Sequence, residues 1–358
     1  MKATAQLQEL GQSLWLDNIT REMLDSGQLQ RYIDEFSISG LTSNPSIFDK
    51  AIKSGAYDDD IRRKAAAAPG RETLFFELAI EDLRRAADLF APIHHRTAGV
   101  DGWVSLEVSP VLAYDTAHSV RAAADLHARA GRQNVFIKIP GTEQGLGAIE
   151  EATFAGVPIN VTLLFSREQY LASADAYMRG IERRLEAGLD LNVPSVASVF
   201  ISRWDAAVIG RVPDRLRGRL GLAVGLKTYQ AYRQLMDSDR WQRLANAGAR
   251  AQRLLWASTS TKDPESPVTM YIDGLRAPHT INTMPESTLR AFADHGQVGE
   301  PIATDGGDAE ATLAQFESAG INVEVLAVTL QSDGARSFVK SWEDLLSRID
   351  DQVAAVAA

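Results

Sequence analysis

Short apolar segments rich in β-branched and aromatic residues alternate along the chain with longer segments in which apolar residues recur at helical spacing. The pattern predicts eight strands, at Leu14–Ile19, Gly40–Asn44, Gly102–Val108, Asn134–Ile139, Pro158–Phe165, Val196–Ile201, Arg253–Ser258 and Thr280–Met284. Helical spacing extends over Leu74–Phe90, Thr116–Ala130, Arg167–Glu186, Leu216–Met236, Pro285–His295, Asp308–Ser318 and Ser337–Val356. Strands that alternate with helices pair in parallel, and an eightfold alternation is what closes a (β/α)8 barrel. We therefore predict the α/β class with a single (β/α)8 TIM barrel.

No segment has the composition of a linker between domains. Gly and Pro are scattered, and the most glycine-dense stretch, Thr304–Asp308, is typical of a single turn. We expect one domain over residues 1–358, a barrel with helical additions at the N and C termini. Two stretches fit the alternation least well: Ala66–Arg71, and Val212–Arg219, which has the character of an insertion between barrel elements.

The composition excludes several classes of function. The 358 residues are 45% hydrophobic and 23% charged, which suits a soluble chain with a large core. A formal charge of −10 repels a phosphate backbone, so we expect no nucleic acid partner. No run approaches the ~20 apolar residues of a membrane helix, and the first ten residues lack the apolar centre of a signal peptide. We expect a cytoplasmic protein without a membrane association.

Metal and cofactor signatures are missing from the sequence. It contains no cysteine, and its six histidines show neither H-x-H nor H-E-x-x-H spacing. The G-x-G-x-x-G and Walker lysine motifs are also absent, as is the G-x-S-x-G nucleophile elbow. We predict no metal site and no cofactor.

Lys138 lies inside the apolar strand segment Val135–Pro140, where strand alternation turns it away from the face of Ile137 and Ile139. In a barrel that direction is the lumen. An edge-strand lysine would be the ordinary interpretation, but this strand is central in the predicted barrel. Apolar surroundings lower the pKa of an amine and so favour its neutral, nucleophilic form, whose product with a carbonyl is a Schiff base. We predict that Lys138 is such a nucleophile.

Asp17 and Glu107 each end an apolar strand segment. One such carboxylate alone would be explained by a helix cap or a salt bridge. Two beside a buried lysine suggest proton carriers, because carbinolamine formation, dehydration and carbon–carbon cleavage each require proton transfer. We predict that both are catalytic.

Other polar residues are expected at the same end of the barrel. Asn160 and Thr162 are two positions apart, so both should face the lumen while Val161 and Leu163 face the helices. A hydroxylated substrate or mutual hydrogen bonds within one layer would satisfy them equally. Asn44 is a candidate for the same site, although an Asn before Pro45 is also typical of a helix start.

The strand at Val196–Ile201 supplies three further candidates. Ser198 and Phe200 should face the lumen, and Arg203 follows the strand, where a guanidinium suits a phosphate. The alternative for Arg203 is a surface ion pair, with Asp205 as the partner.

Six ordered motifs resemble the successive strand motifs of the transaldolase family. They are Thr42–Ser46, Ser105–Ser109, Ile137–Pro140, Asn160–Ser166, Ser198–Arg203 and Trp256–Lys262. The resemblance extends from about Leu14 to Pro285, and Asn282–Pro285 is similar to an element of the longer bacterial branch. It implies a class I aldolase-like barrel and cofactor-free transfer of a dihydroxyacetone unit in the non-oxidative pentose phosphate pathway. The implied reaction converts sedoheptulose 7-phosphate and glyceraldehyde 3-phosphate to erythrose 4-phosphate and fructose 6-phosphate.

The resemblance also implies roles for individual residues. Lys138 matches the Schiff-base lysine and Asp17 the acid/base for the C4 hydroxyl, while Glu107 and Thr162 match the pair that positions a proton-relaying water. The remaining matches concern the substrate: hydroxyl contacts at Asn44 and Asn160, nearby pocket residues Thr42 and Ser198, and phosphate contacts Arg203 and Ser258. Where shorter relatives carry a second phosphate-binding arginine, this chain has Ser260, and Lys262 is the expected substitute. Sugar phosphates are the implied partners, with a monomer or homodimer as the assembly.

Three alternatives stay open on the sequence. One is a class I sugar-phosphate aldolase, although fructose-6-phosphate aldolase relatives tend to carry Gln and Tyr where this chain has Glu107 and Phe200. Another is a biosynthetic transaldolase-like enzyme with an altered substrate. The third is a non-catalytic sugar-phosphate sensor, which would have no need of a desolvated amine.

Overall fold

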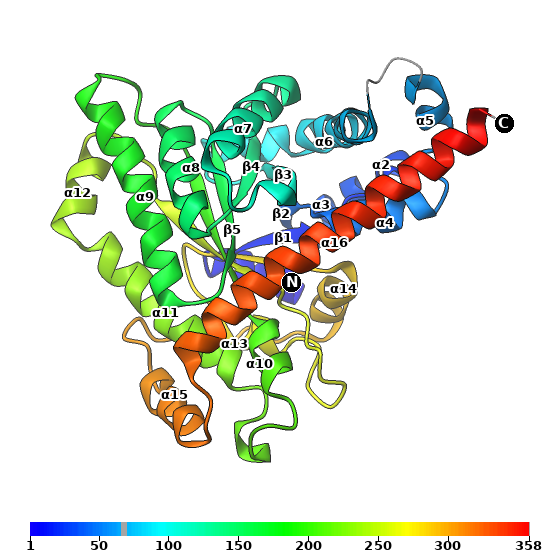
Figure 1. Cartoon of the computed structure of the whole chain (residues 1–358). Helices are drawn as coiled ribbons and strands as arrows, with labels where there is room; N and C mark the ends of the chain where they lie inside the picture. The colour runs from blue at the N-terminus through cyan, green and yellow to red at the C-terminus, as the bar shows by residue number, and fades with distance from the viewer. Residues whose placement is uncertain (66–69, 358) are drawn as a thin grey trace.

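The computed structural model describes residues 1–65 and 70–357 and contains a closed barrel of eight parallel strands joined in sequence order (Figure 1). The strands are β1 (Ser13–Asp17), β2 (Ile38–Thr42), β3 (Trp103–Glu107), β4 (Val135–Pro140), β5 (Ile159–Leu164), β6 (Ser195–Phe200), β7 (Gln252–Ala257) and β8 (Ile281–Met284). The predicted (β/α)8 TIM barrel is thus confirmed, with strand ends displaced by one or two residues.

Helices surround the barrel and close its ends (Figure 1). They are α1 (Ala3–Glu9), α2 (Arg21–Asp25), α3 (Gln28–Phe36), α4 (Pro45–Lys53), α5 (Asp58–Ala65), α6 (Arg71–Arg96), α7 (Thr116–Ala130), α8 (Glu143–Phe154), α9 (Arg167–Glu186), α10 (Ser202–Val208), α11 (Leu220–Met236), α12 (Asp239–Asn246), α13 (Met270–Gly274), α14 (Glu286–His295), α15 (Ala309–Ser318) and α16 (Val323–Ala357), with short 3₁₀ turns η1 (Pro110–Leu112) and η2 (Asp214–Leu216). Among the described residues, none of these helices has both the length and the apolar composition needed to cross a bilayer.

Three sequence expectations need adjustment. The helix expected over Leu216–Met236 is split into η2 and α11, so Val212–Arg219 is indeed an irregular insertion between α10 and α11. The helix expected over Ser337–Val356 begins at Val323, because an apolar face packed on α15 and the barrel overrides the weak helix propensity around Gly334. Of the stretch Ala66–Arg71, residues 66–69 lie outside the described residues.

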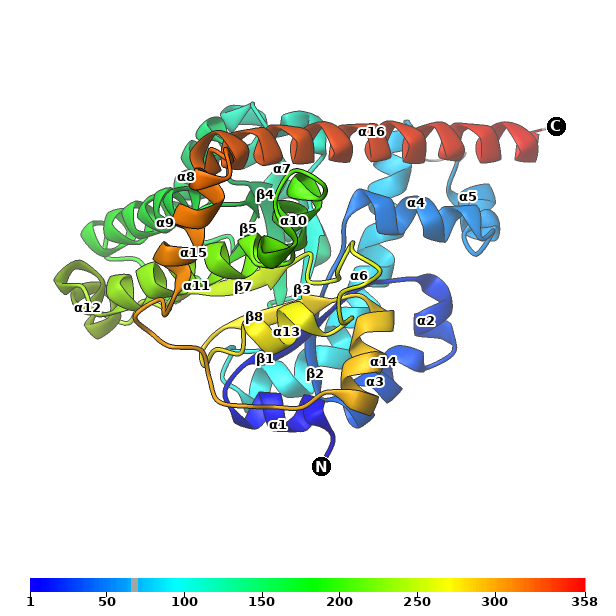
Figure 2. The same ribbon diagram turned by 90° about the horizontal axis from the view of Figure 1, so that it is seen from below.

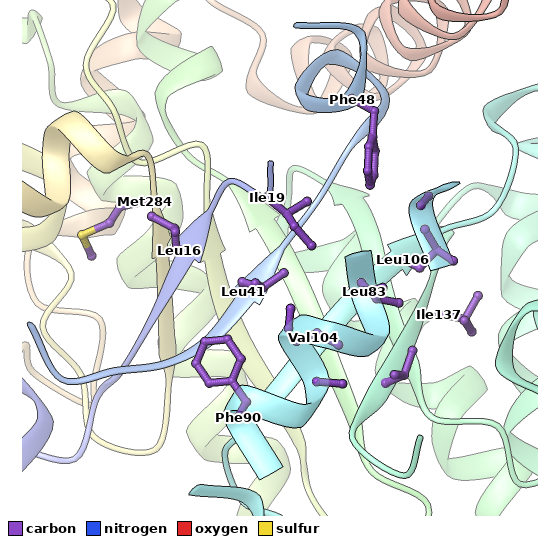
Figure 3. Close-up of a cluster of buried hydrophobic side chains, with 14 of the residues drawn as sticks. Leu16, Ile19, Leu41, Phe48, Leu83, Phe90, Val104, Leu106, Ile137 and Met284 are labelled. Carbon is purple, nitrogen blue, oxygen red and sulfur yellow. The ribbon is translucent and has the colours of Figure 1, made fainter. Parts of the chain in front are cut away.

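The main hydrophobic core lies between the outer face of the barrel and its helices. Figure 3 shows Leu83 and Phe90 of α6 against strand residues such as Leu41 and Val104, all of them buried. Inward and outward positions alternate along each strand, so the same strands that bury these side chains turn the intervening residues toward the lumen.

The lower part of the lumen is filled by aromatic rings. Trp103 stacks on Phe136 with 4.1 Å between ring centroids, and Trp15 lies 6.2 Å from Phe136. Gly40 makes room for this packing, since a Cβ there would lie 2.7 Å from the indole of Trp15. These rings therefore form the floor of the carboxyl-terminal part of the lumen.

Strand β5 contains an irregularity that overturns one expectation. The register of β5 against β6 shifts between Val161 and Leu164, and Leu163 has a left-handed backbone with φ of 58°. As a result Leu164 joins Val161 in the core beneath the helices, whereas Leu163 packs with Phe165 and Phe200 in the cluster at the barrel end. Leu163 was predicted to face the helices; the helix that it meets is α16 at the barrel end, because a bulge at this point interrupts strand alternation.

The long helix α16 crosses the carboxyl-terminal end of the barrel. In Figure 2 it lies opposite α1 and runs from α15 past α8 and α10 to α4 and α5. Its contacts include α4, α5, α6, η1 and β5. It thus packs on segments that follow several different strands, which is where (β/α)8 barrels carry their active sites.

Candidate active site

A cavity of about 200 Å³ opens at the carboxyl-terminal ends of the strands. Most of the predicted site residues line it, namely Asp17, Thr42, Asn44, Lys138, Thr162, Ser198, Phe200, Arg203, Ser258 and Lys262. A larger cavity of about 520 Å³ lies at the amino-terminal end of the barrel and contains none of them. The structure thus brings together residues from six strands at the end where barrel chemistry is expected.

Lys138 points into the lumen and is 5% exposed. Its Nζ donates a hydrogen bond to Glu107 Oε2 at 3.1 Å and another to the Ser43 carbonyl at 3.0 Å. Strand register produces this arrangement, because Glu107 of β3 and Asn160 of β5 are the direct neighbours of Lys138 on either side. The predicted inward orientation of Lys138 is confirmed.

Two carboxylates flank the amine, the buried Glu107 and the half-buried Asp17. Burial raises the pKa of Asp17, while the charges of Lys138 and Lys262 and a 2.8 Å hydrogen bond from Thr42 Oγ1 act in the opposite direction. Burial also raises the pKa of Glu107, and the charge of Lys138 opposes this shift. A raised pKa makes each carboxylate a better proton acceptor once it is ionised, which suits general acid–base chemistry.

Two polar atoms near Lys138 are buried without a partner among the described residues, Glu107 Oε1 and Thr162 Oγ1. Buried polar groups ordinarily form hydrogen bonds to protein or to water. The other carboxylate oxygen of this glutamate, Oε2, already accepts a hydrogen bond from Lys138. Both atoms therefore have capacity to bind water or a substrate hydroxyl.

Asn160 lies deeper than the residues that line the cavity. It is fully buried, its Nδ2 donates to Ser105 Oγ at 3.1 Å, and its Oδ1 accepts from Ser198 Oγ at 2.7 Å. This is the mutual hydrogen bonding within a barrel layer that the sequence left open for Asn160. In the register of β4 and β5, Asn160 lies directly beside Lys138.

Asn44 combines both of its alternatives. It precedes Pro45 as the N-cap of α4, and its Oδ1 accepts from the Ile47 amide at 3.2 Å. It also lines the cavity. Capping holds the side chain in one orientation at the rim of the site.

The cations lie at the outer part of the cavity. Arg203, in the first turn of α10, lines it, and so do Ser258, Ser260 and Lys262 of the segment that follows β7. Ser258 has a left-handed backbone with φ of 55° and hydrogen-bonds Ser202 through its hydroxyl at 2.9 Å. Strained non-glycine residues of this kind cluster at functional sites.

Arg203 does not pair with Asp205. The carboxylate of Asp205 instead accepts from the amides of Leu220 and Gly221 and from the Tyr271 hydroxyl, where it holds the start of α11. The surface ion pair considered for Arg203 is thus excluded by the structure.

Sequence reasoning missed several lining residues, among them Thr283 and Phe338. Thr283 hydrogen-bonds Thr42 at 2.9 Å, and its inward place in β8 was available from strand alternation. Phe338 lies on α16, and no sequence pattern linked that helix to the strand ends. Within residues 1–65 and 70–357, no group of three or more His, Cys, Asp or Glu side chains is arranged to hold a metal ion.

Comparisons with known proteins identify the family of this chain. Residues 14–349 match the family described as Transaldolase/Fructose-6-phosphate aldolase. The chain is 44% identical to the Transaldolase of Arthrobacter sp. (strain FB24), an alignment that covers 98% of this chain and 97% of the relative. Identity to the Transaldolase of Thermobifida fusca (strain YX) is 45%, with 98% of each chain covered, and identity to that of Neisseria gonorrhoeae is 40%, with 97% and 99% covered. The chain therefore belongs to the transaldolase/fructose-6-phosphate aldolase family.

Proposed function

We propose that this protein is a transaldolase, a transferase that moves a dihydroxyacetone unit between sugar phosphates through a Schiff base on Lys138. The proposed reaction converts sedoheptulose 7-phosphate and glyceraldehyde 3-phosphate to erythrose 4-phosphate and fructose 6-phosphate, in the non-oxidative pentose phosphate pathway. The observation that carries the proposal is a buried lysine in hydrogen-bond contact with one buried carboxylate and within the field of a second.

Formation of the Schiff base begins with loss of a proton from Lys138. Glu107 is the acceptor within reach, and its raised pKa favours that transfer. The neutral amine then attacks the C2 carbonyl of the ketose, and the resulting carbinolamine loses water after proton transfer to its hydroxyl. A water held between Glu107 Oε1 and Thr162 Oγ1 is proposed to relay these protons.

Asp17 acts in the carbon–carbon step. Its carboxylate takes the proton of the C4 hydroxyl as the C3–C4 bond breaks, and the electron pair of that bond passes into the protonated Schiff base to form an enamine on Lys138. The aldose leaves with C4 as its aldehyde carbon. The enamine then attacks the acceptor aldehyde, Asp17 returns its proton to the new hydroxyl, and hydrolysis of the Schiff base frees Lys138.

The remaining lining residues hold the substrate. Asn44, Ser198 and Thr42 face the region of the sugar hydroxyls, while Asn160 keeps Ser198 oriented. Arg203 and Ser258, with Lys262 as a further cation, are proposed to contact the phosphate. No cofactor or metal takes part in this scheme. We further propose a single-domain, cytoplasmic enzyme that is a monomer or homodimer.

The direct test is to trap the intermediate. The protein is incubated with fructose 6-phosphate, reduced with borohydride and measured by intact mass and peptide mapping. We expect one reduced dihydroxyacetone adduct, on the peptide that carries Lys138. Absence of an adduct would refute the proposal.

A class I aldolase would form the same adduct, so a second measurement is needed. Fructose 6-phosphate is supplied with erythrose 4-phosphate, and free dihydroxyacetone is measured beside sedoheptulose 7-phosphate. A transaldolase forms mainly sedoheptulose 7-phosphate. Release of dihydroxyacetone in amounts equal to the donor consumed would instead establish an aldolase.

A further inference from the structure

One face of α16 lies against the candidate site. Gln331, Gly334, Phe338 and Ser341 follow one another at intervals of three, four and three residues, which places them in a single row along a helix. All four lie against segments at the carboxyl-terminal end of the barrel, as the following contacts show. In Figure 2 this helix spans that end of the molecule from α15 to α5.

Gln331 and Ser341 fix the position of the row. The Gln331 side-chain amide donates to the carbonyls of Gly141 and Leu163, each at 2.9 Å, and so ties α16 to the segments that follow β4 and to the bulge of β5. Ser46 Oγ, at the start of α4, lies 2.9 Å from Ser341 Oγ. Because Gln331 and Ser341 are both anchored, the turns of α16 between them are held at a fixed distance from the cavity.

Gly334 is the point of closest approach to Arg203. A Cβ at position 334 would lie 3.0 Å from Leu163 Cδ2 and 3.1 Å from Arg203 Nη1. Both distances are shorter than ordinary van der Waals contact. The absence of a side chain at Gly334 therefore leaves the space in which the guanidinium lies.

Arg203 is held by aromatic faces. Its Cζ lies 5.2 Å from the ring centroid of Phe200 and 5.8 Å from that of Phe338. Within the part of the chain that the structure describes, the guanidinium has no hydrogen bond or ion pair to protein. Burial lowers the pKa of Arg203, and the charge of Glu107 opposes this shift. A ring face attracts the positive charge without accepting its N–H hydrogen bonds, so the donors of Arg203 stay available to a ligand.

We infer that Phe338 is a positioning residue for Arg203, and that α16 thereby sets the preference of this site for phosphorylated sugars. The inference rests on the proposed function, in which Arg203 binds the substrate phosphate. Phe338 lies on α16, after the last barrel strand, and its ring contacts Arg203. It therefore acts on the substrate through that arginine. Gly334 completes the arrangement by keeping the space beside Nη1 open.

The first experiment compares Phe338→Leu with Phe338→Tyr. Leucine keeps apolar volume but removes the ring face, so we expect KM for fructose 6-phosphate to rise about threefold to tenfold with little change in kcat. Tyrosine keeps the ring face and should stay within about twofold of the parent protein. For unphosphorylated fructose, KM should not change in either variant. Equal rises for the two donors, or no rise with Phe338→Leu, would overturn the inference.

Trp342→Leu is the matched control. Trp342 lies one turn further along α16, is equally buried, and packs edge-on against Phe75 at 4.9 Å, away from the cavity. Both leucine variants should lower the thermal midpoint, but only Phe338→Leu should change KM. If Trp342→Leu raises KM to the same extent, the effect is general loosening of α16 and the inference is wrong.

A double-mutant cycle tests whether Phe338 acts through Arg203. Once Arg203→Ala has removed the guanidinium, adding Phe338→Leu should produce no further rise in KM for fructose 6-phosphate. Independent, multiplicative effects would show that Phe338 acts by another route. Gly334→Ala offers a second probe. Alanine has a higher helix propensity than glycine, so the thermal midpoint should be equal or higher. The added Cβ should nevertheless raise KM, because it occupies the space beside Arg203 Nη1.

Failure of the inference can be told apart from failure of the proposed function. Calorimetric titration with inorganic phosphate measures the anion site without any turnover, in the parent protein, Phe338→Leu and Arg203→Ala. Weaker phosphate binding in both variants supports the inference even if the borohydride adduct is absent. Phosphate binding that is weakened by Arg203→Ala and unaltered by Phe338→Leu overturns it even if transaldolase activity is present.

Discussion

The amine of Lys138 donates a 3.1 Å hydrogen bond to the carboxylate of Glu107, with both side chains almost completely buried. A buried ion pair of this kind pays a desolvation cost that its mutual attraction only partly offsets. The pair is therefore better explained by chemistry than by stability, because the ammonium group of Lys138 can pass its proton directly to the carboxylate of Glu107.

Replacing the lysine should separate folding from chemistry. Lys138→Met removes a buried charge and roughly keeps side-chain volume, so the variant should fold. We expect no borohydride-trapped adduct and no measurable transfer, whereas Lys262→Met should still form the adduct. A full-strength adduct in Lys138→Met, mapped to another lysine, would show that the nucleophile has been assigned to the wrong residue.

Asp17→Asn should stabilise the fold while abolishing turnover. Burial raises the pKa of Asp17 in the folded state, so the folded protein binds a proton there at pH values at which the unfolded chain has lost it. The stability contributed by Asp17 thus falls as pH rises from its ordinary value through the raised one. Above that window we expect Asn to increase the free energy of unfolding.

Chemical denaturation of both proteins at several pH values checks this sign. The advantage of Asp17→Asn should shrink as pH falls and disappear below about pH 4, where aspartate is protonated in both states. A variant that is less stable than the parent at pH 7 would mean that the contacts of Asp17 with Thr42 and Lys138 outweigh its burial.

Arg203→Ala should mainly weaken binding of phosphorylated substrates. A charge-assisted contact contributes about 1.5–3 kcal/mol, so KM should rise by roughly one to two orders of magnitude if ground state and transition state lose it equally. Lys262→Ala should have a smaller effect, because its side chain is a flexible point charge. KM for fructose 6-phosphate is measured for both variants, with Arg211→Ala as a control at an exposed arginine. A larger rise in KM with Lys262→Ala than with Arg203→Ala would make Lys262 the main phosphate contact.

Phe200→Tyr should increase release of free dihydroxyacetone relative to transfer. Phe200 lines the cavity and is 7% exposed, and its ring offers water no hydrogen bond. A tyrosine keeps the ring face that lies over Arg203 and adds a hydroxyl able to orient a hydrolytic water near the intermediate. Free dihydroxyacetone and transfer product are measured from one donor with and without acceptor. An unaltered ratio in a folded, active variant would leave Phe200 with a packing role.

Turnover should withstand exhaustive EDTA treatment. Schiff-base chemistry stabilises the carbanion through the imine and requires no divalent ion. Activity is assayed after dialysis against the chelator, with a sample refilled with Mg²⁺ or Zn²⁺ for comparison. Loss of activity that either ion restores would favour a metal-enolate mechanism instead.

Local sequence pattern was sufficient for the parts of this site that belong to single strands. Alternation by itself turns Lys138 inward, because a strand has a period of two and the neighbouring isoleucines belong to the core. The same rule failed at Leu163, where a bulge with a left-handed backbone changes the direction of the next side chains. Such a bulge depends on the pairing of β5 with β6 and on the Gln331 contact, neither of which is local.

The amino-acid pattern was enough to predict the order of strands and helices, the inward residues of regular strands and the family motifs, because these follow from backbone periodicity and from short segments. The three-dimensional fold was needed to show that Lys138 pairs with Glu107 and that Asn160 is engaged by Ser105 and Ser198. It was also needed to show that Phe338 reaches Arg203 from a helix 135 positions later in the chain. Those contacts depend on strand register and on the path of α16 across the barrel. Both are set by long-range packing between segments that are far apart in the sequence, so no single segment contains the information that fixes these contacts.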